Sequence, residues 1–527
     1  MASITPSIDD FLKPLAIDSH TVFDLSRELE ATFRHLSAES LDQFLPTPIS
    51  ESILRPVAGH DRGRYEPIPD NIKSGGTNLR VAFVELFGSG NVALSQVAES
   101  LEGLKTNGTV NNHVPHRRLE RLLEKSWPIQ NHLKNENSEN LFAWIGDRVA
   151  QVVRKGCDTF GLDPGVSLPM GVTFSFPMKQ SSLSEATLMA MGKGFAITSD
   201  LDLGGHLIKG YEKYRTQDMP LIEITAISND AVSTLVSFIF QFPAETHQKA
   251  TMGLIVGTGS NATLPLKLSS LHPSKRPSSI SVLPDQDIDD VKIAVNTEWS
   301  INGTAPPLRK LGLISQWDEA LDKAGEVPGF QPLEYMTAGR YLGELARLIF
   351  VDYMSLLGFP LEILPEKLRE KFGLTTTFIS HFYPDSPKGH MLDQLEREFP
   401  AQDGPGGFFW EERMAHVLYR IAHSIEVRAA GIIAASTVGL LRSADEIPSH
   451  DLNGWYTGIT ELAVGYTGGC IQFFQNYLAD TQTFIDEILA IEYSGDAPIR
   501  VTLSPCHDGG ITGAGILVPA ALASHST

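Results

Sequence analysis

An apolar run that ends in an amide and a carboxylate constrains this chain most strongly. Residues 224–228 read Ile-Thr-Ala-Ile-Ser, and Asn229 and Asp230 follow directly. A buried carboxylate at the end of such a run can take a proton from a substrate hydroxyl group, and the neighbouring amide can hold the substrate in place. Asn-Asp alone is also a common turn signal, so this interpretation depends on motifs elsewhere in the chain.

The length and net charge of the chain limit the number of its lobes and the kinds of partner it can bind. With 527 residues, the chain exceeds the size at which one hydrophobic core keeps growing, so we expect two lobes with a cleft between them. The formal net charge of -21 would repel a nucleic-acid backbone or an anionic membrane. We therefore expect small-molecule partners, with no nucleic acid and no membrane among them.

The cysteines and the N-terminal segment indicate a cytoplasmic protein. The chain has only three cysteines, Cys157, Cys470 and Cys506, without a metal-ligand spacing, so we interpret them as free thiols in a reducing compartment. The N-terminal segment lacks the basic and apolar parts of a secretory signal. We expect no apolar run long enough to span a bilayer. A nuclear location stays open if the protein is regulatory.

Hydrophobic periodicity predicts an N-terminal helix followed by an α/β lobe. Residues 19–41 carry apolar side chains at helical spacing, and a Pro-rich connector follows at 45–48. Residues 79–86 and part of 166–176 are typical of strands. Strands that alternate with helical patterns indicate an α/β lobe.

The second half of the chain predicts a lobe with a large helical core. Residues 335–357 and 414–441 are long, largely apolar and helical in period. Strands are expected at 253–256, 292–295 and 499–503, with a surface loop rich in Ser, Pro and Asp at 266–290. Glycines at 509, 510, 513 and 515 lead into a final Ala-rich helix. We find no internal sequence repeat.

Further motifs accompany Asn229-Asp230 along the chain. They are Thr-Phe-Ser-Phe-Pro at 173–177, Lys-Gly-Phe at 193–195, Gly-Thr-Gly-Ser-Asn at 257–261, Asn-Thr-Glu-Trp at 296–299 and Glu-Tyr-Met-Thr-Ala-Gly-Arg-Tyr-Leu-Gly-Glu at 334–344. This ordered set resembles the eukaryotic hexokinase family. The resemblance implies a two-lobed α/β fold of the actin-like, ribonuclease H-like ATPase type, with a sugar and ATP cleft between the lobes.

The resemblance also implies how the chain divides. We expect an N-terminal helix and connector over residues 1–65, a small lobe over 66–228, a large lobe over 229–500, and a C-terminal nucleotide-side segment with a helix over 501–527. Sugar binding is expected to close the lobes and to exclude water from the phosphoryl group that is transferred.

The sugar side of the implied site has one base and several groups that hold hydroxyls. Asp230 matches the catalytic base, which would accept the proton of the sugar 6-hydroxyl as the terminal phosphoryl group of ATP transfers. Glutamates and amides suit a polyol, because each can bond more than one hydroxyl. The implied sugar-binding residues are Ser175, Lys193, Asn229, Asp230, Asn261, Glu298 and Glu334.

The nucleotide side of the implied site begins with paired glycines before a strand. Such glycines let backbone amides approach a phosphate, although the motif alone is also a plain hairpin turn. The implied cosubstrate is ATP with Mg²⁺, without a direct protein ligand to the metal. The implied ATP-binding residues are Gly75, Gly76, Thr77, Asn78, Arg80, Thr234, Gly257, Thr258, Thr467 and Gly468.

The nucleotide side also departs from the family pattern. Lys73 stands where the family has an Asp that interacts with magnesium and the phosphates. Pro67 and Pro69, with the Asp-Asn pair that follows, predict that the first strand of the nucleotide hairpin is missing or distorted. A local splice artefact near Pro69 is an alternative explanation. Other departures are Ala231 for Thr, Ser233 for Gly, Thr467 for Asp and Gly469 for Ser.

Two functions follow from this resemblance. The first is an ATP-dependent sugar 6-kinase of carbohydrate metabolism, and the second is a catalytically inactive hexokinase-like regulator that senses a sugar and acts through a protein partner. Lys73, Ala231 and Ser233 favour the regulator. Within the first, N-acetylglucosamine is slightly favoured over glucose. Gly192 replaces a Thr and opens space, and residues 300–302 are closer to fungal N-acetylglucosamine kinases.

Overall fold

A computed structural model defines the structure of the chain. It describes residues 6–54, 65–75, 78–86, 119–129, 133, 138–189, 201–242, 247–283, 286–288, 291–401, 408–448 and 458–524. For residues 65–75, 86, 119, 523 and 524 it describes the backbone only.

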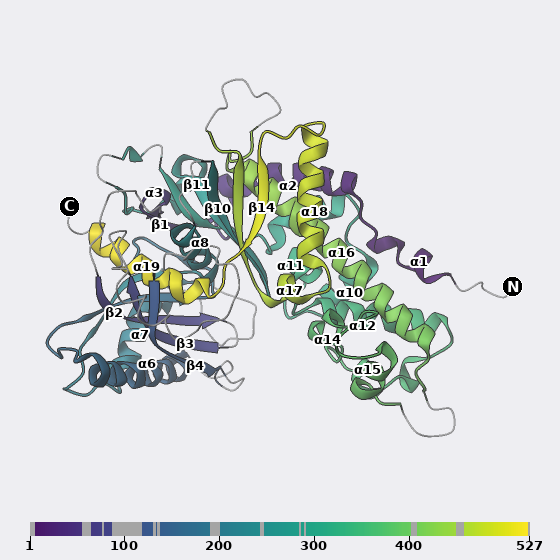
Figure 1. Ribbon diagram of the computed structural model, residues 1–527, viewed down its shortest axis with the longest axis horizontal. Coiled ribbons are helices and arrows are strands. Elements are labelled where there is room, and N and C mark those ends of the chain that lie inside the picture. Colours follow the sequence, from purple (N-terminus) through teal and green to yellow (C-terminus); the bar gives the residue numbers. More distant parts are fainter. Residues whose placement is uncertain are drawn as a thin grey trace, which may run out of the picture.

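Two β-sheets form the centres of two lobes (Figure 1). The sheet of the small lobe has five strands in the order β4 (Leu119–Pro128), β3 (Asn78–Leu86), β2 (Tyr65–Gly75), β5 (Leu168–Phe174) and β9 (Ile222–Ser228). The sheet of the large lobe has six strands in the order β1 (Leu45–Ser50), β12 (Lys292–Asn296), β11 (Ser260–Lys267), β10 (Gln248–Val256), β13 (Glu461–Thr467) and β14 (Arg500–Pro505).

The two sheets share one pairing pattern. In the small lobe, an antiparallel meander of β2, β3 and β4 continues into the parallel strands β5 and β9. In the large lobe, β10, β11 and β12 form the meander, and β13 and β14 are the parallel strands. The fold thus contains a structural repeat that the sequence does not show. A small third sheet joins β6 (Met178–Lys179), β7 (Thr187–Leu188) and β8 (Leu201–Asp202).

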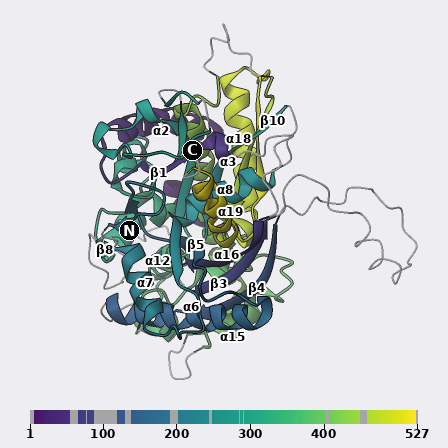
Figure 2. The ribbon, with the colours of Figure 1, turned by 90° about the vertical axis from the view of Figure 1, so that its left-hand side faces the viewer.

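Helices separate and cover the sheets. Helices α8 (Asp230–Gln241) and α19 (Gly509–Ser524) pack on each other between the sheets, with α19 on β5 and α8 on β10. Helices α6 (Ser138–Phe160) and α7 (Leu203–Glu212) belong to the small lobe, and α6 lies along the outer face of its sheet in Figures 1 and 2. The small lobe is therefore a sheet between two helical layers.

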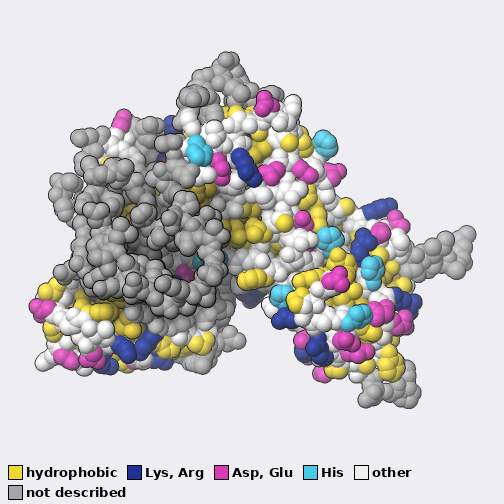
Figure 3. Space-filling view, in the orientation of Figure 1, with side chains coloured by type: hydrophobic (Ala, Val, Ile, Leu, Met, Phe, Trp, Pro, Cys, Tyr) yellow, Lys and Arg dark blue, Asp and Glu magenta, His cyan; other side chains and the backbone are white. Residues whose placement is uncertain are grey.

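The large lobe has a helical core beside its sheet. Its main helices are α2 (Ser19–Glu39), α16 (Glu412–Ser443) and α18 (Tyr477–Glu492), which pack on one another. Shorter helices complete the described part, namely α1 (Ile8–Phe11), α3 (Glu51–Leu54), α9 (Ala305–Lys310), α10 (Gln316–Lys323), α11 (Pro332–Thr337), α12 (Leu342–Leu356), α13 (Glu366–Arg369), α14 (Thr376–Ser380), α15 (Met391–Glu398) and α17 (Gly469–Phe473). In Figure 3, acidic and basic side chains alternate over this helical part.

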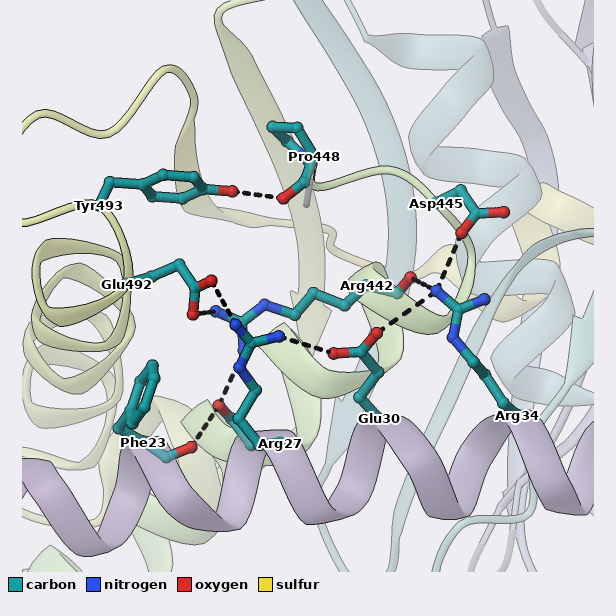
Figure 4. A network of polar contacts seen from close by, with 10 residues as sticks. Phe23, Arg27, Glu30, Arg34, Arg442, Asp445, Pro448, Glu492 and Tyr493 are labelled. Atoms are coloured by element: carbon teal, nitrogen blue, oxygen red, sulfur yellow. Dashed lines mark hydrogen bonds and ion pairs between the residues drawn. The ribbon is translucent and has the colours of Figure 1, made fainter. Parts of the chain in front are cut away.

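An ionic network, buried at Arg442 and Glu492 and exposed at Arg34 and Asp445, holds α2 in the large lobe (Figure 4). Arg442 of α16 donates to one carboxylate oxygen of Glu492 at 2.8 Å, and Arg27 of α2 donates to the other. Further along α2, Arg34 donates to Asp445 at 2.9 Å. Burial lowers the pKa of Arg442, and Glu492 opposes this effect. The N-terminal helix is thus an integral part of the large lobe.

The observed lobes do not follow the expected boundaries. Helix α2 and strand β1 lie in the large lobe, whereas we expected residues 1–65 to form a separate region. Strand β14 also belongs to the large lobe, while α19 packs on the sheet of the small lobe. Each lobe is therefore built from separate stretches of the chain.

Two proline-containing segments form strands, contrary to a simple interpretation of their composition. Residues 45–48, expected to be a connector, belong to β1, which is an edge strand where proline removes no needed donor. Strand β2 is present, so of the two outcomes expected for it, missing or distorted, a distorted strand is observed. Its register with β3 shifts on both sides of Ile68, next to Pro67 and Pro69, and β5 pairs only with residues 71–74. The strand is therefore irregular where the prolines lie.

Two expectations about helices also need correction. The apolar stretch at 335–357 is divided between α11 and α12, because residues 338–341 form a turn that bonds Gly257 and Thr258, directly after β10. Helix α16 is long and apolar enough to cross a membrane by length and composition, although we expected no such run. Its most apolar 18 residues are 89% buried within the fold, so α16 is explained as the core helix of the large lobe.

Candidate active site

Three parallel strands of the small lobe end at the same edge of their sheet. The register of β2, β5 and β9 brings their carboxyl ends together. Ser175 follows β5, Asn229 follows β9, and Gly75 ends β2. Ligands of open α/β sheets bind outside the carboxyl ends of such strands. Ser175 and Asn229, which we predicted for the sugar, and Gly75, which we predicted for phosphate, therefore share one edge.

Asp230 begins helix α8 at this edge. Asn229 is the N-cap, because its side-chain oxygen accepts from the backbone N–H of Ala231 at 2.8 Å. The Asn229 amide donates to the carbonyl of Phe176 at 3.1 Å. The Ser175 hydroxyl donates to Oδ2 of Asp230 at 2.7 Å. A negative charge is stabilised in the first turn of a helix, so the three polar residues form one group around a carboxylate.

Two further residues of α8 lie inside the lobe. The Ser233 hydroxyl is buried and lies 2.6 Å from the hydroxyls of both Thr173 and Ser228. The Thr234 hydroxyl donates to the carbonyl of Asp230 at 2.8 Å, and Thr234 is buried. The serine that replaces the expected glycine at 233 therefore packs in the core and does not project into the cleft.

The phosphate hairpin is described only in part. Gly75 and Asn78 pair across the end of β2 and β3, and Gly76 and Thr77 between them lie outside the described residues. Arg80 of β3 donates to Oδ1 of Asp508 at 2.7 Å, and Arg121 of β4 donates to Oδ2 at 2.9 Å. Burial acts to raise the pKa of Asp508, but these guanidinium groups hold the pKa below its ordinary value. Arg80 is thereby fixed beside the start of α19.

The large lobe carries a second polar group, formed by two amides and a glutamate. The Asn261 amide donates to Oδ1 of Asn296 at 2.8 Å and to Oε1 of Glu298 at 3.3 Å, and the Asn296 amide donates to the same Glu298 oxygen at 2.7 Å. Glu298 is buried and has a φ of 46°, which is left-handed backbone in a residue other than glycine. Backbone strain of this kind is found often at functional sites.

Glu334 of α11 joins this second group through the start of β11. Its Oε2 accepts from the backbone N–H of Ser260, the neighbour of Asn261, at 3.2 Å. Glu334 is only 2% exposed, and its Oε1 has no hydrogen-bond partner within the described part of the chain. A buried carboxylate oxygen without a donor is costly. This oxygen therefore has unused capacity to accept a hydrogen bond, such as one from a ligand hydroxyl.

The structure thus collects the predicted sugar residues into two groups, one on each lobe. Ser175, Asn229 and Asp230 form the group on the small lobe. Asn261, Glu298 and Glu334 form the group on the large lobe. Lys193 lies outside the described residues, as does Gly192. These two groups are the halves from which a sugar pocket between the lobes would be built.

Two predicted nucleotide segments meet in the large lobe. Strands β10 and β13 are parallel, and the backbones of Ile255 and Thr467 are paired near their ends. Gly468 follows with a φ of 121°, and a Cβ there would lie 2.3 Å from the carbonyl oxygen of Val256. Only glycine fits this contact. Gly257, Thr258 and Gly468 therefore lie at one edge of the sheet.

A cavity of about 330 Å³ lies beside these segments. Its lining combines glycine backbone, hydroxyl groups, one guanidinium and the aromatic ring of Phe473, which is 62% exposed. The lining residues are Gly257, Thr258, Gly339, Arg340, Thr376, Thr377, Ser380, His381, Gly469, Cys470 and Phe473. Such a cavity offers close backbone approach for phosphates and an aromatic face for a base.

Sequence reasoning missed several residues of both sites. Asn296 stood inside a noted motif, but a single Asn after a strand does not show which side chains it faces. Arg340 also stood in a motif, and its backbone N–H donates to the carbonyl of Thr258 at 3.1 Å. Thr376 and Phe473 come from short helices without a recognisable motif. Only tertiary packing brings them to the cavity.

Comparisons with known proteins agree with this geometry. Two family models, both described as hexokinase, match residues 7–240 and 251–520. Hexokinase-1 of Arabidopsis thaliana is 27% identical over 500 residues, which cover 93% of this chain and 90% of that protein. Glucokinase of Aspergillus niger is 24% identical over 479 residues, which cover 87% of this chain and 86% of that protein.

Solved structures show the same fold. A hexokinase from Schistosoma mansoni complexed with glucose superposes with a TM-score of 0.71 at 22% identity, and the match covers 98% of each chain. A second hexokinase crystal structure superposes with a TM-score of 0.66 at 21% identity, covering 97% of this chain and 98% of that one. The fold is thus the two-lobed actin-like ATPase fold. The two family models show that the chain belongs to the hexokinase family.

Proposed function

We propose that this protein is an ATP-dependent hexose 6-kinase. Asp230 would accept the proton of the sugar 6-hydroxyl, while Ser175 and Asn229 hold the sugar on the small lobe. Asn261, Glu298 and Glu334 would hold other hydroxyls on the large lobe. The names of the curated relatives, hexokinase and glucokinase, support a hexose as the substrate class.

The observation that carries this proposal is Oε1 of Glu334, which has no hydrogen-bond partner among the described residues. Oε1 is buried next to the group formed by Asn261, Asn296 and Glu298, and Ser260 binds only the other oxygen. A hydroxyl donor from a sugar would satisfy this oxygen and remove the cost of burying it unpaired. A site that binds a polyol by several such groups rejects analogues that lack a hydroxyl.

The described residues fit a nucleotide on the large lobe. Gly257, Thr258 and Arg340 would receive the phosphates, and the exposed ring of Phe473 would face the base. The described residues contain no cluster of three or more acidic, His or Cys side chains suited to a metal ion. We therefore propose that Mg²⁺ enters with the ATP phosphates, where it neutralises charge on the transferred group.

The hexose is a finer part of the proposal. We propose N-acetylglucosamine as a substrate in addition to glucose, because Gly192 replaces a larger residue and Ser300, Ile301 and Asn302 change the segment after Glu298. Ser300 and Ile301 are buried in the fold. Their influence on the sugar would therefore act through the position of Glu298.

An assay of ADP release tests the function. Purified protein is incubated with Mg-ATP and glucose, fructose, mannose or N-acetylglucosamine in turn. We expect sugar-dependent ADP release that is absent from the Asp230→Asn variant. No ADP above background with any sugar would reject the kinase.

The competing proposal is a sugar sensor without phosphotransfer. Lys73 in place of an acidic residue is the observation that favours it, because a cation cannot hold a magnesium-bound water as a carboxylate does. Thermal stabilisation by a sugar without ADP release would support the sensor. Lys73→Asp should then raise ADP release if this position alone limits the reaction.

A further inference from the structure

A second cavity has a volume of about 710 Å³. Among the described residues, none of those predicted to bind sugar or ATP lines it. The lining residues are Leu41, Leu45, Pro46, Met178, Lys179, Gln180, Ser181, Glu185, Ala186, Thr187, Asp202, Ser274, Lys275, Arg276, Pro277 and Ser278. This volume is within the usual range for small-molecule sites.

The cavity is built from both lobes. One wall consists of β1 and the segment 274–278 of the large lobe, and the other consists of β6, β7 and β8. Hydrogen bonds join the walls beside the cavity. The Thr47 hydroxyl donates to Oε1 of Gln180 at 3.1 Å, and the Ser278 hydroxyl donates to the carbonyl of Ser181 at 3.1 Å. A ligand here would therefore contact both lobes at once.

The wall from the large lobe is linked to the proposed sugar site through one residue. Lys275 donates to the backbone carbonyl of Gln43 at 2.9 Å. The side-chain amide of Gln43 donates to the backbone carbonyl of Glu298 at 2.9 Å. Glu298 has the strained backbone described above. A ligand that fixes Lys275 would therefore also fix the backbone position of Glu298.

The wall from the small lobe is linked to Asn229 in a similar way. The side-chain amide of Gln180 donates to the carbonyl of Ile227, two residues before Asn229, at 3.0 Å. The segment that contains Met178 begins directly after Phe176 and Pro177, and the Phe176 carbonyl accepts from the Asn229 amide. Hydrogen bonds thus connect both halves of the proposed sugar pocket to the walls of this one cavity.

The charges of the cavity indicate an anionic ligand with hydroxyl groups. Three cations line it, namely Lys179, Lys275 and Arg276. Lys275 already donates to the Gln43 carbonyl, and Arg276 donates to the carbonyls of Leu271 at 3.2 Å and Ser269 at 3.1 Å, so each has further donors to offer a ligand. Its two acidic side chains already form hydrogen bonds within the fold, because Glu185 accepts from the Ser181 hydroxyl and Asp202 caps the N-terminus of α7. Hydroxyls of Thr187, Ser274 and Ser278 add uncharged polar groups. Cations with short polar side chains suit a phosphate on a polyol.

We propose that this cavity binds a phosphomonoester of a small polyol and that the bound ligand tightens sugar binding. The binding site depends only on the cavity, while the coupling rests on the proposed sugar site. The ligand would stabilise the arrangement of lobes that positions Glu298 and Asn229 together. By linkage, sugar and ligand must strengthen each other by the same factor.

Calorimetric titration of the full chain with sorbitol 6-phosphate tests the proposal, with sorbitol and inorganic phosphate as comparison ligands. We expect the phosphomonoester to bind more tightly than either. Lys179 and Arg276 are exposed and lie outside the proposed catalytic groups. Their joint replacement, Lys179→Gln with Arg276→Gln, should raise the Kd about 100-fold, because two charged donors are lost. The control, Lys209→Gln with Arg309→Gln, removes equal charge elsewhere and should leave the Kd unchanged.

A second titration measures coupling. Glucose is titrated with and without saturating sorbitol 6-phosphate, and we expect about a fivefold fall in the glucose Kd. An unchanged glucose Kd would overturn the coupling. Equal binding by wild type and the Lys179/Arg276 variant, or equal affinity for inorganic phosphate, would overturn the site. If glucose does not bind at all, the proposed sugar site fails, while the sorbitol 6-phosphate result still decides the cavity.

Discussion

The Ser175 hydroxyl donates to Oδ2 of Asp230 at 2.7 Å across the carboxyl ends of two parallel strands. This contact fixes the carboxylate at the start of α8. We predict that Asp230→Asn lowers kcat by a factor of about 10² to 10⁴, because general-base catalysis contributes this much. The sugar Kd should change little. Steady-state kinetics and calorimetry measure the two effects, with Asp158→Asn on the exposed face of α6 as control. Equal losses in kcat and sugar affinity would contradict the role as base.

Glu334→Gln should weaken sugar binding without weakening the fold. The substitution removes the negative charge that would accept a hydrogen bond from a sugar hydroxyl. A hydrogen bond to a charged group is worth about 1.5–3 kcal/mol, which corresponds to about a tenfold or greater change in the sugar Kd. Oε1 has no partner among the described residues, so the sugar-free protein loses no bond there. Glucose titration and thermal unfolding test this, with the exposed Glu366→Gln as control. A fall in stability at unchanged sugar affinity would show a structural role only.

Gly468→Ala should impair the nucleotide side. A Cβ at this position would lie 2.3 Å from the Val256 carbonyl oxygen, and the φ of 121° is unfavourable for alanine. Gly495→Ala is the matched control, because its φ of 91° is equally unusual but no atom lies within 4 Å of the added Cβ. We expect the ATP KM to rise in the first variant and to stay unchanged in the second. Similar kinetics in both would show that the contact is irrelevant to ATP.

Glu492→Gln should destabilise the large lobe. Arg442 and Glu492 are both buried, and removal of one partner leaves the other charge without compensation. Such a loss costs about 3–5 kcal/mol of the free energy of unfolding. Denaturant titration measures it. The exposed pair of Lys323 and Glu319 provides the control, because Glu319→Gln should change stability by less than about 0.5 kcal/mol.

Glu426 should make stability depend on pH. It is fully buried in α16, and burial raises its pKa to about 7, while His423, whose Nδ1 lies 3.4 Å away, acts to lower it and Asp480 adds to the rise. The folded protein therefore holds this proton more tightly than the unfolded chain. Stability should fall as pH rises from the unfolded pKa of 4.5 toward 7.

The variant Glu426→Gln removes this titration, because it keeps an uncharged side chain at every pH. It also removes the carboxylate that raises the pKa of His423, so the measured change belongs to the pair. We expect it to match wild type near pH 4.5 and to be more stable near pH 8 by on the order of 2 kcal/mol. Unfolding measured across this range gives the slope, and Glu412→Gln at the exposed start of α16 should keep the slope of wild type. A parallel decline in Glu426→Gln would assign the slope to other groups.

Much of the fold could be predicted from the sequence, because strong periodicity survives in long elements. The helix at 19–41, the strand at 79–86 and the helix at 414–441 are observed as α2, β3 and α16. The strand β1 was missed because its two prolines are tolerated only at a sheet edge, and edge position is a tertiary property. The same holds for β2, whose irregular end has one neighbour.

The site was less accessible to sequence reasoning. Motif order placed Asn261, Glu298 and Glu334 together, and their hydrogen bonds agree with that grouping. Their roles toward a sugar remain a prediction. The serine at 233 was expected to alter the phosphate-binding side of the site. Its hydroxyl instead forms hydrogen bonds with Thr173 and Ser228 inside the lobe. The direction of a side chain depends on packing from distant segments, which no local pattern contains.

The position of α19 has a consequence for how the molecule is made. The sheet of the small lobe is complete by residue 228, yet the helix that covers its inner face begins at Gly509. During synthesis, the apolar inner face of the small-lobe sheet therefore stays uncovered until almost the whole large lobe has been translated. A chaperone that shields this face on the ribosome would be expected to favour a correct assembly of the chain.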